Sequence, residues 1–186
     1  MSFIENIKNY IPYNEQEEKD KELILTAVSS FNNLLTRKNP IMHFTSSGYI
    51  INKTHDKVLM IYHKIYNSWG WTGGHNDGDS DFLRVSIKEA KEETGLKNIN
   101  VISDDIFAID VLTVDGHIKN SKFVSAHLHL NLTYLLEASE NEELIVNEEE
   151  TKGVKWIPIK ELDKHCSEEY MINNVYNKLN EKINKL

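Results

Sequence analysis

Three glutamates, Glu89, Glu92 and Glu93, have the spacing of one face of a helix. At 3.6 residues per turn, relative positions i, i+3 and i+4 share an arc of about 100°, so the three carboxylates would point the same way. Clustered carboxylates bind hard divalent cations such as Mg²⁺ or Mn²⁺, and these ions in turn bind substrate phosphates. A solvated acidic face is the alternative. Repulsion between Glu89 and Glu93, about 0.2–0.5 kcal/mol, is too small to decide between the two.

The segment before the glutamates favours the metal site. Residues 67–74 form a predicted loop rich in glycine and aromatic residues, and this loop ends on Gly73 and Gly74. A turn at these glycines could bring a backbone carbonyl beside the carboxylates as a further oxygen ligand. Residues 81–94 are predicted to form the helix, which Gly95 ends because glycine suits the left-handed position after the last turn. The apolar stripe that would pack this helix on a sheet consists of Leu83, Ile87 and Ala90.

The segment from Gly74 to Leu96 resembles the Nudix box in its residue types and spacing. That motif reads glycine, five residues, glutamate, seven residues, Arg-Glu, an aliphatic residue, one residue, Glu-Glu, one residue, glycine and an aliphatic residue. The matching positions are Gly74, Glu89, Ala90, Glu92, Glu93, Gly95 and Leu96. Two positions depart from the motif. Ser80 replaces the first glutamate, with Asp79 and Asp81 beside it as substitutes for its charge, and Lys88 replaces the arginine. Lysine keeps the charge but loses the two-pronged contact of arginine with a carboxylate.

The resemblance covers about residues 37–162 and implies a fold and an activity. The implied fold is α/β, a Nudix-like α/β/α sandwich with a mixed β-sheet over residues 41–186, preceded by an N-terminal helical extension over residues 1–40. The implied activity is metal-dependent hydrolysis of the pyrophosphate bond in a nucleoside diphosphate linked to another moiety, such as ADP-ribose, a nucleotide sugar or a nucleoside triphosphate. Mg²⁺ or Mn²⁺ is the implied cofactor.

The resemblance also implies roles for single residues. Glu89 and Glu93 are expected to bind the metal together with a backbone carbonyl at Gly74. Glu92 is either a further ligand or the base that takes a proton from water, and the sequence leaves both open. Glu150 lies where many members of the family place an additional acid, so it is expected as an extra ligand or base.

Aromatic and histidine side chains are the candidates for contacts with the substrate. Trp69 and Trp71 have flat faces that can stack on a base, although packing inside the protein is the alternative. His127 and His129 share one face of a predicted strand and could reach the pocket, although many such histidines are polar members of a sheet face. His75 is expected to order the turn at Gly73 and Gly74 and to line the site with both glycines.

Composition limits the class of protein. The chain has 186 residues, enough for one domain with its own core, and a formal net charge of −8 from 21 Lys and Arg against 29 Asp and Glu. Such a surface does not attract nucleic acid by bulk charge. Its only cysteine, Cys166, excludes a disulfide framework. Neither a signal peptide nor an apolar run of about 18 residues is visible, so we expect a cytoplasmic protein with a small-molecule substrate and no membrane partner.

Periodicity predicts helices alternating with strands. The predicted helices cover residues 3–10, 15–37, 81–94 and 168–186, and the predicted strands cover 43–51, 57–63, 101–114, 122–136 and 154–157. This order favours a mixed sheet covered on both faces, with a turn at Asp115 and Gly116. The first two helices are predicted to form an amphipathic cap on the domain, and contact in a homodimer is the alternative.

Two other functions compete with hydrolysis. Ser80 and Lys88 suggest a non-catalytic ligand-sensing Nudix domain, but the basic recognition helix that a DNA-binding sensor normally carries is not visible in the sequence. An isopentenyl-diphosphate isomerase would need catalytic cysteine chemistry, and Cys166 is poorly placed to supply it. The intact set of three glutamates favours the hydrolase.

Overall fold

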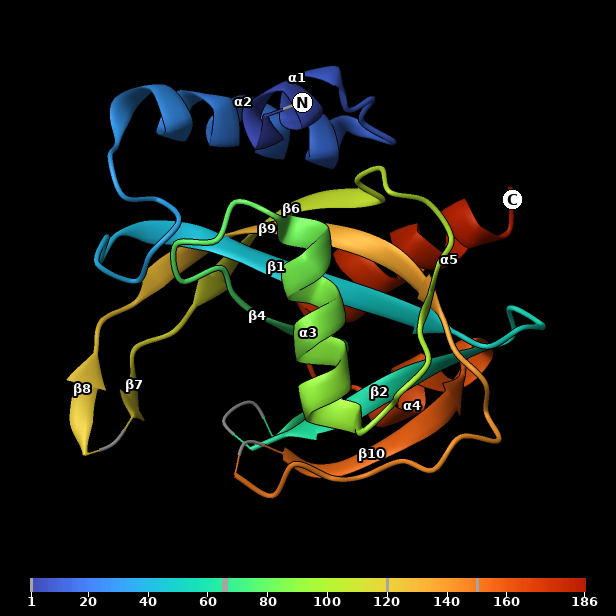
Figure 1. Cartoon of the computed structure of the whole chain (residues 1–186). Coiled ribbons are helices and arrows are strands. Elements are labelled where there is room, and N and C mark those ends of the chain that lie inside the picture. Colours follow the sequence, from blue (N-terminus) through green and yellow to red (C-terminus); the bar gives the residue numbers. More distant parts are fainter. Residues whose placement is uncertain (1, 65–66, 120, 150) are drawn as a thin grey trace.

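The computed structural model describes residues 2–64, 67–119, 121–149 and 151–186. A mixed sheet forms the centre, and helices cover both of its faces, as the sequence predicted (Figure 1). Its strands are β1 (Met42–Ile51), β2 (Lys57–His63), β3 (Ser68–Gly70), β4 (Thr72–His75), β5 (Asn100–Val101), β6 (Ala108–Val114), β9 (His127–Glu137) and β10 (Thr151–Pro158). A separate ribbon pairs β7 (His117–Lys119) with β8 (Lys122–Val124). The helices are α1 (Phe3–Asn9), α2 (Glu15–Ser30), α3 (Phe82–Thr94), α4 (Leu162–His165) and α5 (Asn177–Ile183), with the short helical turns η1 (Ile159–Glu161) and η2 (Met171–Tyr176).

The sheet is organised around the parallel pair β1 and β9, which are in register along the whole of β1. Successive side chains of a strand point to opposite faces, so each of these strands serves two packing layers. On one face Ile50 packs with Ala90 of α3, and on the other face Tyr49 packs with Tyr176 at the end of η2. Figure 1 shows α3 in front of the sheet and α5 behind it.

The two N-terminal helices pack on the domain as the predicted amphipathic cap. Ile7 and Ile24 are fully buried, and with Ala27 they join the core cluster that contains Phe44 and Ile109 of the sheet. In Figure 1 both helices lie across the top of the molecule, above β6 and β9. The two helices therefore share the core of the domain. Burial of each large apolar side chain contributes about 1.5–3 kcal/mol to stability.

Helix α2 also covers the outer edge of β6. The backbone N–H of Val111 in β6 donates to Oδ2 of Asp20 in α2 at 3.0 Å. An uncovered edge strand offers unpaired backbone groups to other chains. The carboxylate of Asp20 therefore satisfies one such group where the sheet would otherwise end in the open.

A buried ionic cluster joins α2, β6 and α5. Nζ of Lys178 lies 2.6 Å from Oδ1 of Asp110 and 3.2 Å from Oε1 of Glu17, and all three side chains are at most 3% exposed. The same ammonium group donates to Gln16 at 3.0 Å. Burial raises the pKa of Asp110, because a buried carboxylate loses the hydration that stabilises its charge. Glu17 also lies 3.7 Å from Nζ of Lys182, whereas Asp110 has its ion pair with Lys178. Removal of Lys178 would therefore leave the buried Asp110 without its cation and Glu17 with only the longer pair.

Two strand predictions and the predicted end of the second helix were wrong. Helix α2 ends at Ser30 instead of continuing to Arg37, because Asn33 takes a left-handed backbone (φ 61°) and the Leu34 carbonyl accepts a hydrogen bond from Phe44 of β1. The predicted strand 101–114 is divided into β5 and β6. The predicted strand 122–136 is likewise divided into β8 and β9, and β6 pairs with β9 while the β7–β8 ribbon extends beyond them. The connection is therefore longer than a turn at Asp115 and Gly116.

Smaller differences concern the loop at residues 67–74 and the last helix. The loop contains the short strands β3 and β4, which pair with β2 and β1. In the predicted last helix Tyr170 is half exposed, whereas Val175, Leu179 and Ile183 are buried. The predicted strands at 43–51 and 57–63 are confirmed as β1 and β2. Within the described ranges, none of the helices is both long and apolar enough to cross a bilayer.

Substitution of Lys178 tests the buried ionic cluster. We expect Lys178→Met to lower the free energy of unfolding by about 3–5 kcal/mol, because Asp110 loses its cation while remaining buried and Glu17 keeps only its longer pair with Lys182. Urea unfolding measures the change. Lys19→Met is the matched control: Lys19 pairs with Glu22 on the surface, where such a pair contributes at most about 1 kcal/mol. Equal stability of the two variants would show that the cluster contributes nothing specific.

Candidate active site

Helix α3 has a defined beginning and end, which fix the positions of its glutamates. Oδ1 of Asp81 accepts a hydrogen bond from the N–H of Arg84 at 3.0 Å and caps the first turn. Gly95 follows the last turn with φ 75°, as predicted, and a Cβ at this position would lie 2.6 Å from Cβ of Ile145. Glycine is therefore required at position 95 by its backbone conformation and by its neighbour.

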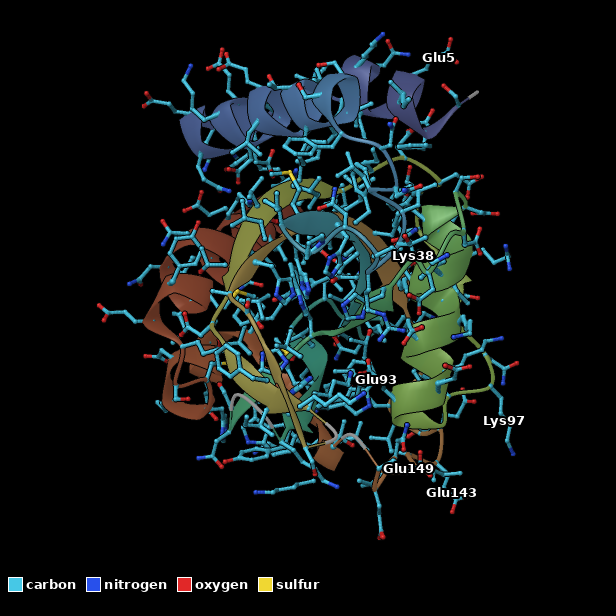
Figure 2. The ribbon with its side chains drawn as sticks, turned by 90° about the vertical axis from the view of Figure 1, so that its left-hand side faces the viewer. Glu5, Lys38, Glu93, Lys97, Glu143 and Glu149 are labelled. Carbon is cyan, nitrogen blue, oxygen red and sulfur yellow. The ribbon has the colours of Figure 1, made fainter. Side chains whose placement is uncertain are left out.

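The three glutamates differ in exposure. The side chain of Glu92 is 54% exposed and that of Glu89 is 16% exposed, whereas Glu93 is buried at 3%. Oε2 of Glu93 accepts a hydrogen bond from the backbone N–H of Gly73 at 3.0 Å. Figure 2 shows Glu93 pointing from α3 toward the interior of the molecule. The three carboxylates share one side of the helix as predicted from the spacing, but Glu92 faces solvent and Glu93 faces strand β4.

Strand β4 approaches α3 closely because two successive residues have no side chain. A Cβ at Gly74 would lie 2.4 Å from both Cδ and Oε2 of Glu89. A Cβ at Gly73 would lie 2.6 Å from Oγ of Ser47 and 2.8 Å from the carbonyl oxygen of Ser46 in β1. All these distances are shorter than real Cβ contacts. Gly74 therefore allows β4 to meet α3 at the Glu89 carboxylate, and Gly73 allows β4 to lie close to β1. The turn that the sequence placed beside the acids is thus part of a strand.

Lys88 connects two of the carboxylates. Its Nζ lies 3.0 Å from Oε1 of Glu89 and 2.9 Å from Oε2 of Glu92. Hydrogen bonds to Glu92 and Glu89 raise the pKa of Lys88 above its ordinary value, so the side chain remains charged at all physiological pH values. A single ammonium group thereby offsets part of the repulsion between the acids.

The acidic residues on either side of Ser80 make local contacts at the N-terminal end of α3. Asp79 forms an ion pair with Arg84 and accepts a hydrogen bond from the N–H of Asp81, while the side chain of Asp81 caps the helix. At 1.5 Å per residue, Phe82, the first residue of α3, lies about 10 Å along the axis from Glu89. Asp79 and Asp81 precede it and stabilise the start of α3.

The predicted apolar stripe of α3 packs on the sheet. Ala90 is fully buried in a core cluster with Ile50 and Leu59, and Leu83 and Ile87 are partly buried against this cluster. The helix also buries Phe82 and Val85, which the predicted stripe did not include.

The two tryptophans make contacts within the protein. Trp69 packs edge-on against Tyr62 at 5.3 Å between ring centroids, and Nζ of Lys155 lies 4.4 Å from the Trp69 ring. Trp71 packs edge-on against Tyr176 at 5.7 Å. Both rings are partly buried against the core cluster, which is the packing role considered as the alternative to stacking on a base.

The predicted histidines come together with one that sequence analysis did not single out. Rings of His75 and His129 lie 5.0 Å apart, and both lie 5.0 Å from His43 of β1. His127 stacks on His43 at 4.9 Å and lies 5.1 Å from His129. The sequence placed His43 in a predicted strand but did not indicate a role in a site. His43 lies near His129 because of the β1–β9 register, which could not be predicted from the sequence.

Glu150 lies outside the described residues. The acids before it, Glu148 and Glu149, are exposed, and Figure 2 shows Glu149 below the C-terminal end of α3 in that view. Its expected role as an extra ligand or base stays a prediction.

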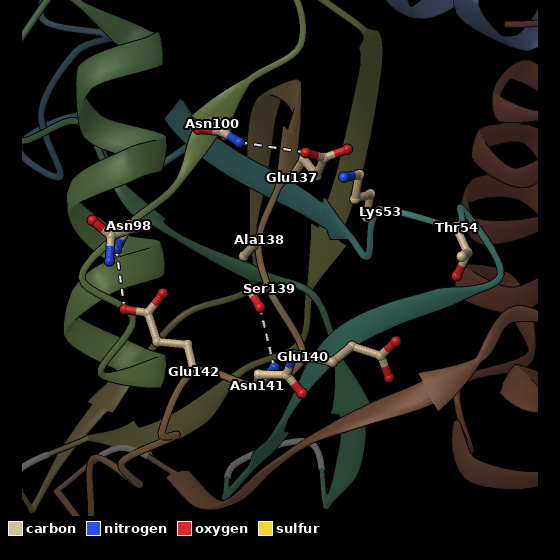
Figure 3. A pocket seen from close by; sticks show the side chains of 10 residues that line it. All are labelled: Lys53, Thr54, Asn98, Asn100, Glu137, Ala138, Ser139, Glu140, Asn141 and Glu142. Carbon is tan, nitrogen blue, oxygen red and sulfur yellow. Dashed lines mark hydrogen bonds between the residues drawn. The ribbon is translucent and has the colours of Figure 1, made fainter.

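A cavity of about 480 Å³ lies away from the glutamates of α3. Its lining residues, shown in Figure 3, are Lys53, Thr54, Asn98, Asn100 and the segment 137–142. Three of its side chains are carboxylates, and Glu142 already accepts hydrogen bonds from the backbone N–H groups of Lys97 and Asn98. An acid-lined cavity without clustered cations does not suit a phosphorylated substrate.

Comparison with known proteins gives the family. The model of the NUDIX domain matches residues 42–175. A curated relative named "Probable DHNTP pyrophosphohydrolase", from Lactococcus lactis subsp. cremoris (strain MG1363), is 27% identical over 141 residues, which are 75% of this chain and 80% of the relative.

Solved structures share the fold. An Ap4A hydrolase from C. elegans in a binary complex is 16% identical, with a TM-score of 0.55 over 76% of this chain and 95% of that chain. The dihydroneopterin triphosphate pyrophosphohydrolase of E. coli is 10% identical, with a TM-score of 0.55 over 77% of this chain and 96% of that chain. The predicted mixed α/β fold with N-terminal helices is confirmed.

The fold and the glutamate helix define a class of phosphoanhydride hydrolases. The chain belongs to the Nudix family and is a Nudix pyrophosphohydrolase.

Gly74→Ala tests the close approach of β4 to α3. The backbone at Gly74 does not need glycine, but the added methyl group would displace the Glu89 carboxylate. We expect the rate of phosphoanhydride hydrolysis to fall at least about tenfold while the melting temperature changes little, because misplacement of an active-site group by about 1 Å is costly for catalysis.

Gly70→Ala is the matched control, since a Cβ there would lie 3.4 Å from the hydroxyl of Tyr176. Unchanged activity in Gly74→Ala would mean that the contact between Gly74 and Glu89 has no part in catalysis.

Proposed function

We propose that this enzyme uses Mg²⁺ or Mn²⁺, bound at Glu89 and Glu93 with the backbone carbonyl of Gly74, and Glu92 as the proton acceptor, to hydrolyse a nucleotide-like pyrophosphate. The observation that carries this proposal is the convergence of two carboxylates of α3, those of Glu89 and Glu93, on the glycine strand β4. Lys88 links the third carboxylate, that of Glu92, to Glu89. The implied small-molecule substrate is a diphosphate or triphosphate attached to a heterocycle.

The residues present fit a divalent cation. Carboxylate and carbonyl oxygens are the ligands that Mg²⁺ prefers. The ammonium group of Lys88 already lies between Glu89 and Glu92, so a positive charge is favoured at this place. Three carboxylates against one lysine leave an excess of negative charge, which a divalent ion would neutralise and which would otherwise repel a polyphosphate.

Each glutamate has a task that follows from its surroundings. A bound ion would polarise a phosphoryl oxygen, lower the pKa of water and stabilise the leaving phosphate. Glu93 is held by the N–H of Gly73, and Glu89 is confined by its close contact with Gly74, so these two side chains are suited to ligation. Glu92 is the most exposed of the three and meets solvent, which suits it to accept the proton of the attacking water.

The named relatives suggest which substrates to test first. The L. lactis relative and the E. coli structure both carry dihydroneopterin triphosphate in their names, and the C. elegans structure is named for Ap4A. We place dihydroneopterin triphosphate first, because one relative by sequence and one by fold agree on it. ADP-ribose, a nucleotide sugar and a nucleoside triphosphate complete the panel.

The competing functions receive less support. Cys166 is buried in the core, and burial raises the pKa of its thiol to about 11, which does not suit the cysteine chemistry of an isomerase. A ligand sensor without activity would not need three glutamates around a glycine strand. Lys88 in place of arginine still contacts two of these glutamates, so the substitution preserves their orientation.

Hydrolysis assays on the five substrates with Mg²⁺ or Mn²⁺ test the proposed function. We expect phosphate release from at least one substrate and its complete loss after chelation. Glu92→Gln and Glu93→Gln should each lower kcat at least tenfold, because a neutral amide is a poor metal ligand and no base. Gln at position 93 can still accept the hydrogen bond from Gly73, so this variant should remain folded.

Glu22→Gln is the control for the loss of a carboxylate, since Glu22 lies on the exposed face of α2. Activity that resists chelation, or glutamine variants as active as the control, would contradict the proposed mechanism.

A further inference from the structure

Histidines from three different strands meet on the face of the sheet opposite α3. His43 lies on β1, His75 on β4 and His129 on β9. One ring nitrogen of each histidine lies within 4.8 Å of those of the other two, and among the described residues this is a group with the donor atoms of a metal site. The glutamates of α3 contribute nothing to it.

Strand register explains why the histidines meet. His43 is the partner of His129 in the parallel pair, and His75 is the partner of Thr45, two residues further along β1. Residues 43 and 45 share a face of β1, because side chains alternate along a strand. The backbone therefore fixes the three rings on one side of the sheet, independently of the loops.

Burial lowers the pKa of each of the three rings below its ordinary value, because a buried imidazolium loses its hydration. Arg37 and Asp77, whose opposite charges act on His43 and His75, pair with each other at 2.6 and 2.9 Å, so they largely offset one another. The charge of Lys119 also acts on His75. Each neutral imidazole has one nitrogen with a free lone pair, which is the form that binds a metal.

His43 has an orphaned nitrogen. Its side chain is 4% exposed, its Nδ1 lies 3.2 Å from the carbonyl oxygen of Asn39, and its buried Nε2 has no hydrogen-bond partner. Buried polar atoms in native proteins nearly always have a partner. A histidine that binds a metal typically donates its other N–H to a carbonyl, which orients the ring and leaves the lone pair for the ion. His43 has this arrangement.

We propose that His43, His75 and His129 bind one divalent transition-metal ion, with Zn²⁺ as the best match. Imidazole nitrogens suit Zn²⁺ and related ions, whereas Mg²⁺ prefers the oxygens of the glutamates. Three nitrogen ligands leave the fourth tetrahedral position open for water or for a donor atom of a small molecule. Zn–N bonds of about 2.0–2.1 Å require donors about 3.4 Å apart, so the rings draw together when the ion binds. His127, whose Nε2 lies 3.3 Å from Nε2 of His129, positions that ring.

The consequence for the fold is a link between three strands. The ion would connect β1, β4 and β9 one residue after Gly74. Because it binds the folded chain and not the unfolded one, it should raise the melting temperature in proportion to the logarithm of its concentration.

Zn²⁺ titration of the full chain, stripped of metal and kept in excess Mg²⁺, tests the site. The Mg²⁺ occupies the oxygen ligands of α3, so calorimetry should record one Zn²⁺ per chain. Co²⁺ in place of Zn²⁺ reports the geometry, and we expect the visible absorption of a tetrahedral nitrogen site.

His129→Gln and His75→Gln should each weaken Zn²⁺ binding at least about 100-fold, since loss of a neighbour that only orients a ligand already costs 10–100-fold. His55→Asn is the matched control, because His55 is exposed and its positive φ of 56° suits asparagine. Glu93→Gln should bind Zn²⁺ like the wild type even though hydrolysis is lost, which separates this site from the proposed catalytic one.

Absence of Zn²⁺ binding by the wild type in excess Mg²⁺ would overturn the proposal, and so would equal binding by the wild type and either glutamine variant. If a variant fails to fold without metal, the Co²⁺ spectrum of the wild type still decides, because octahedral oxygen ligation lacks the tetrahedral bands.

Discussion

The close approach of β4 to α3 is the constraint on which the arrangement of the carboxylates depends. Gly74 leaves room for Glu89, and the N–H of Gly73 binds Glu93. An isolated helix with three acids on one arc would let them spread into water, where repulsion is reduced. The strand fixes one acid by a hydrogen bond and confines another by contact, so two of the three are positioned before any ion arrives. Such preorganisation lowers the cost of reaching the reactive geometry.

The sheet separates the two sets of side chains that we propose as metal ligands. The oxygen donors lie on α3, which packs on the even-numbered residues of β1, and the histidines extend from the odd-numbered side. Hard ions such as Mg²⁺ prefer the oxygen donors, and borderline ions such as Zn²⁺ prefer the histidine nitrogens. A single register between β1 and β9 therefore produces both environments, because a shift of one residue would exchange the faces of every side chain.

The N-terminal helices contribute to the same structure. Ile7 and Ile24 share a core cluster with the sheet, and Glu17 pairs with Lys178 near the C-terminus. Segments at both ends of the chain are thereby joined at the edge strand β6. An arrangement of the chain that separated these buried charges would be unfavourable, because a buried charge without its partner is costly. The two ends of the chain are thus held in one arrangement.

The sequence by itself determined the local features: the helix of the Nudix box, its end at Gly95, the spacing of the three glutamates, and the first two strands of the sheet. Periodicity, capping and glycine conformation act over a few residues, so they can be read without the fold. Only the tertiary structure decided that Glu93 is buried and Glu92 exposed, that α2 stops at Ser30, and that His43 meets His129. These outcomes depend on contacts between segments far apart in the chain. At these positions, packing and strand pairing between distant segments outweigh the weak local preference of each residue for a helix or a strand.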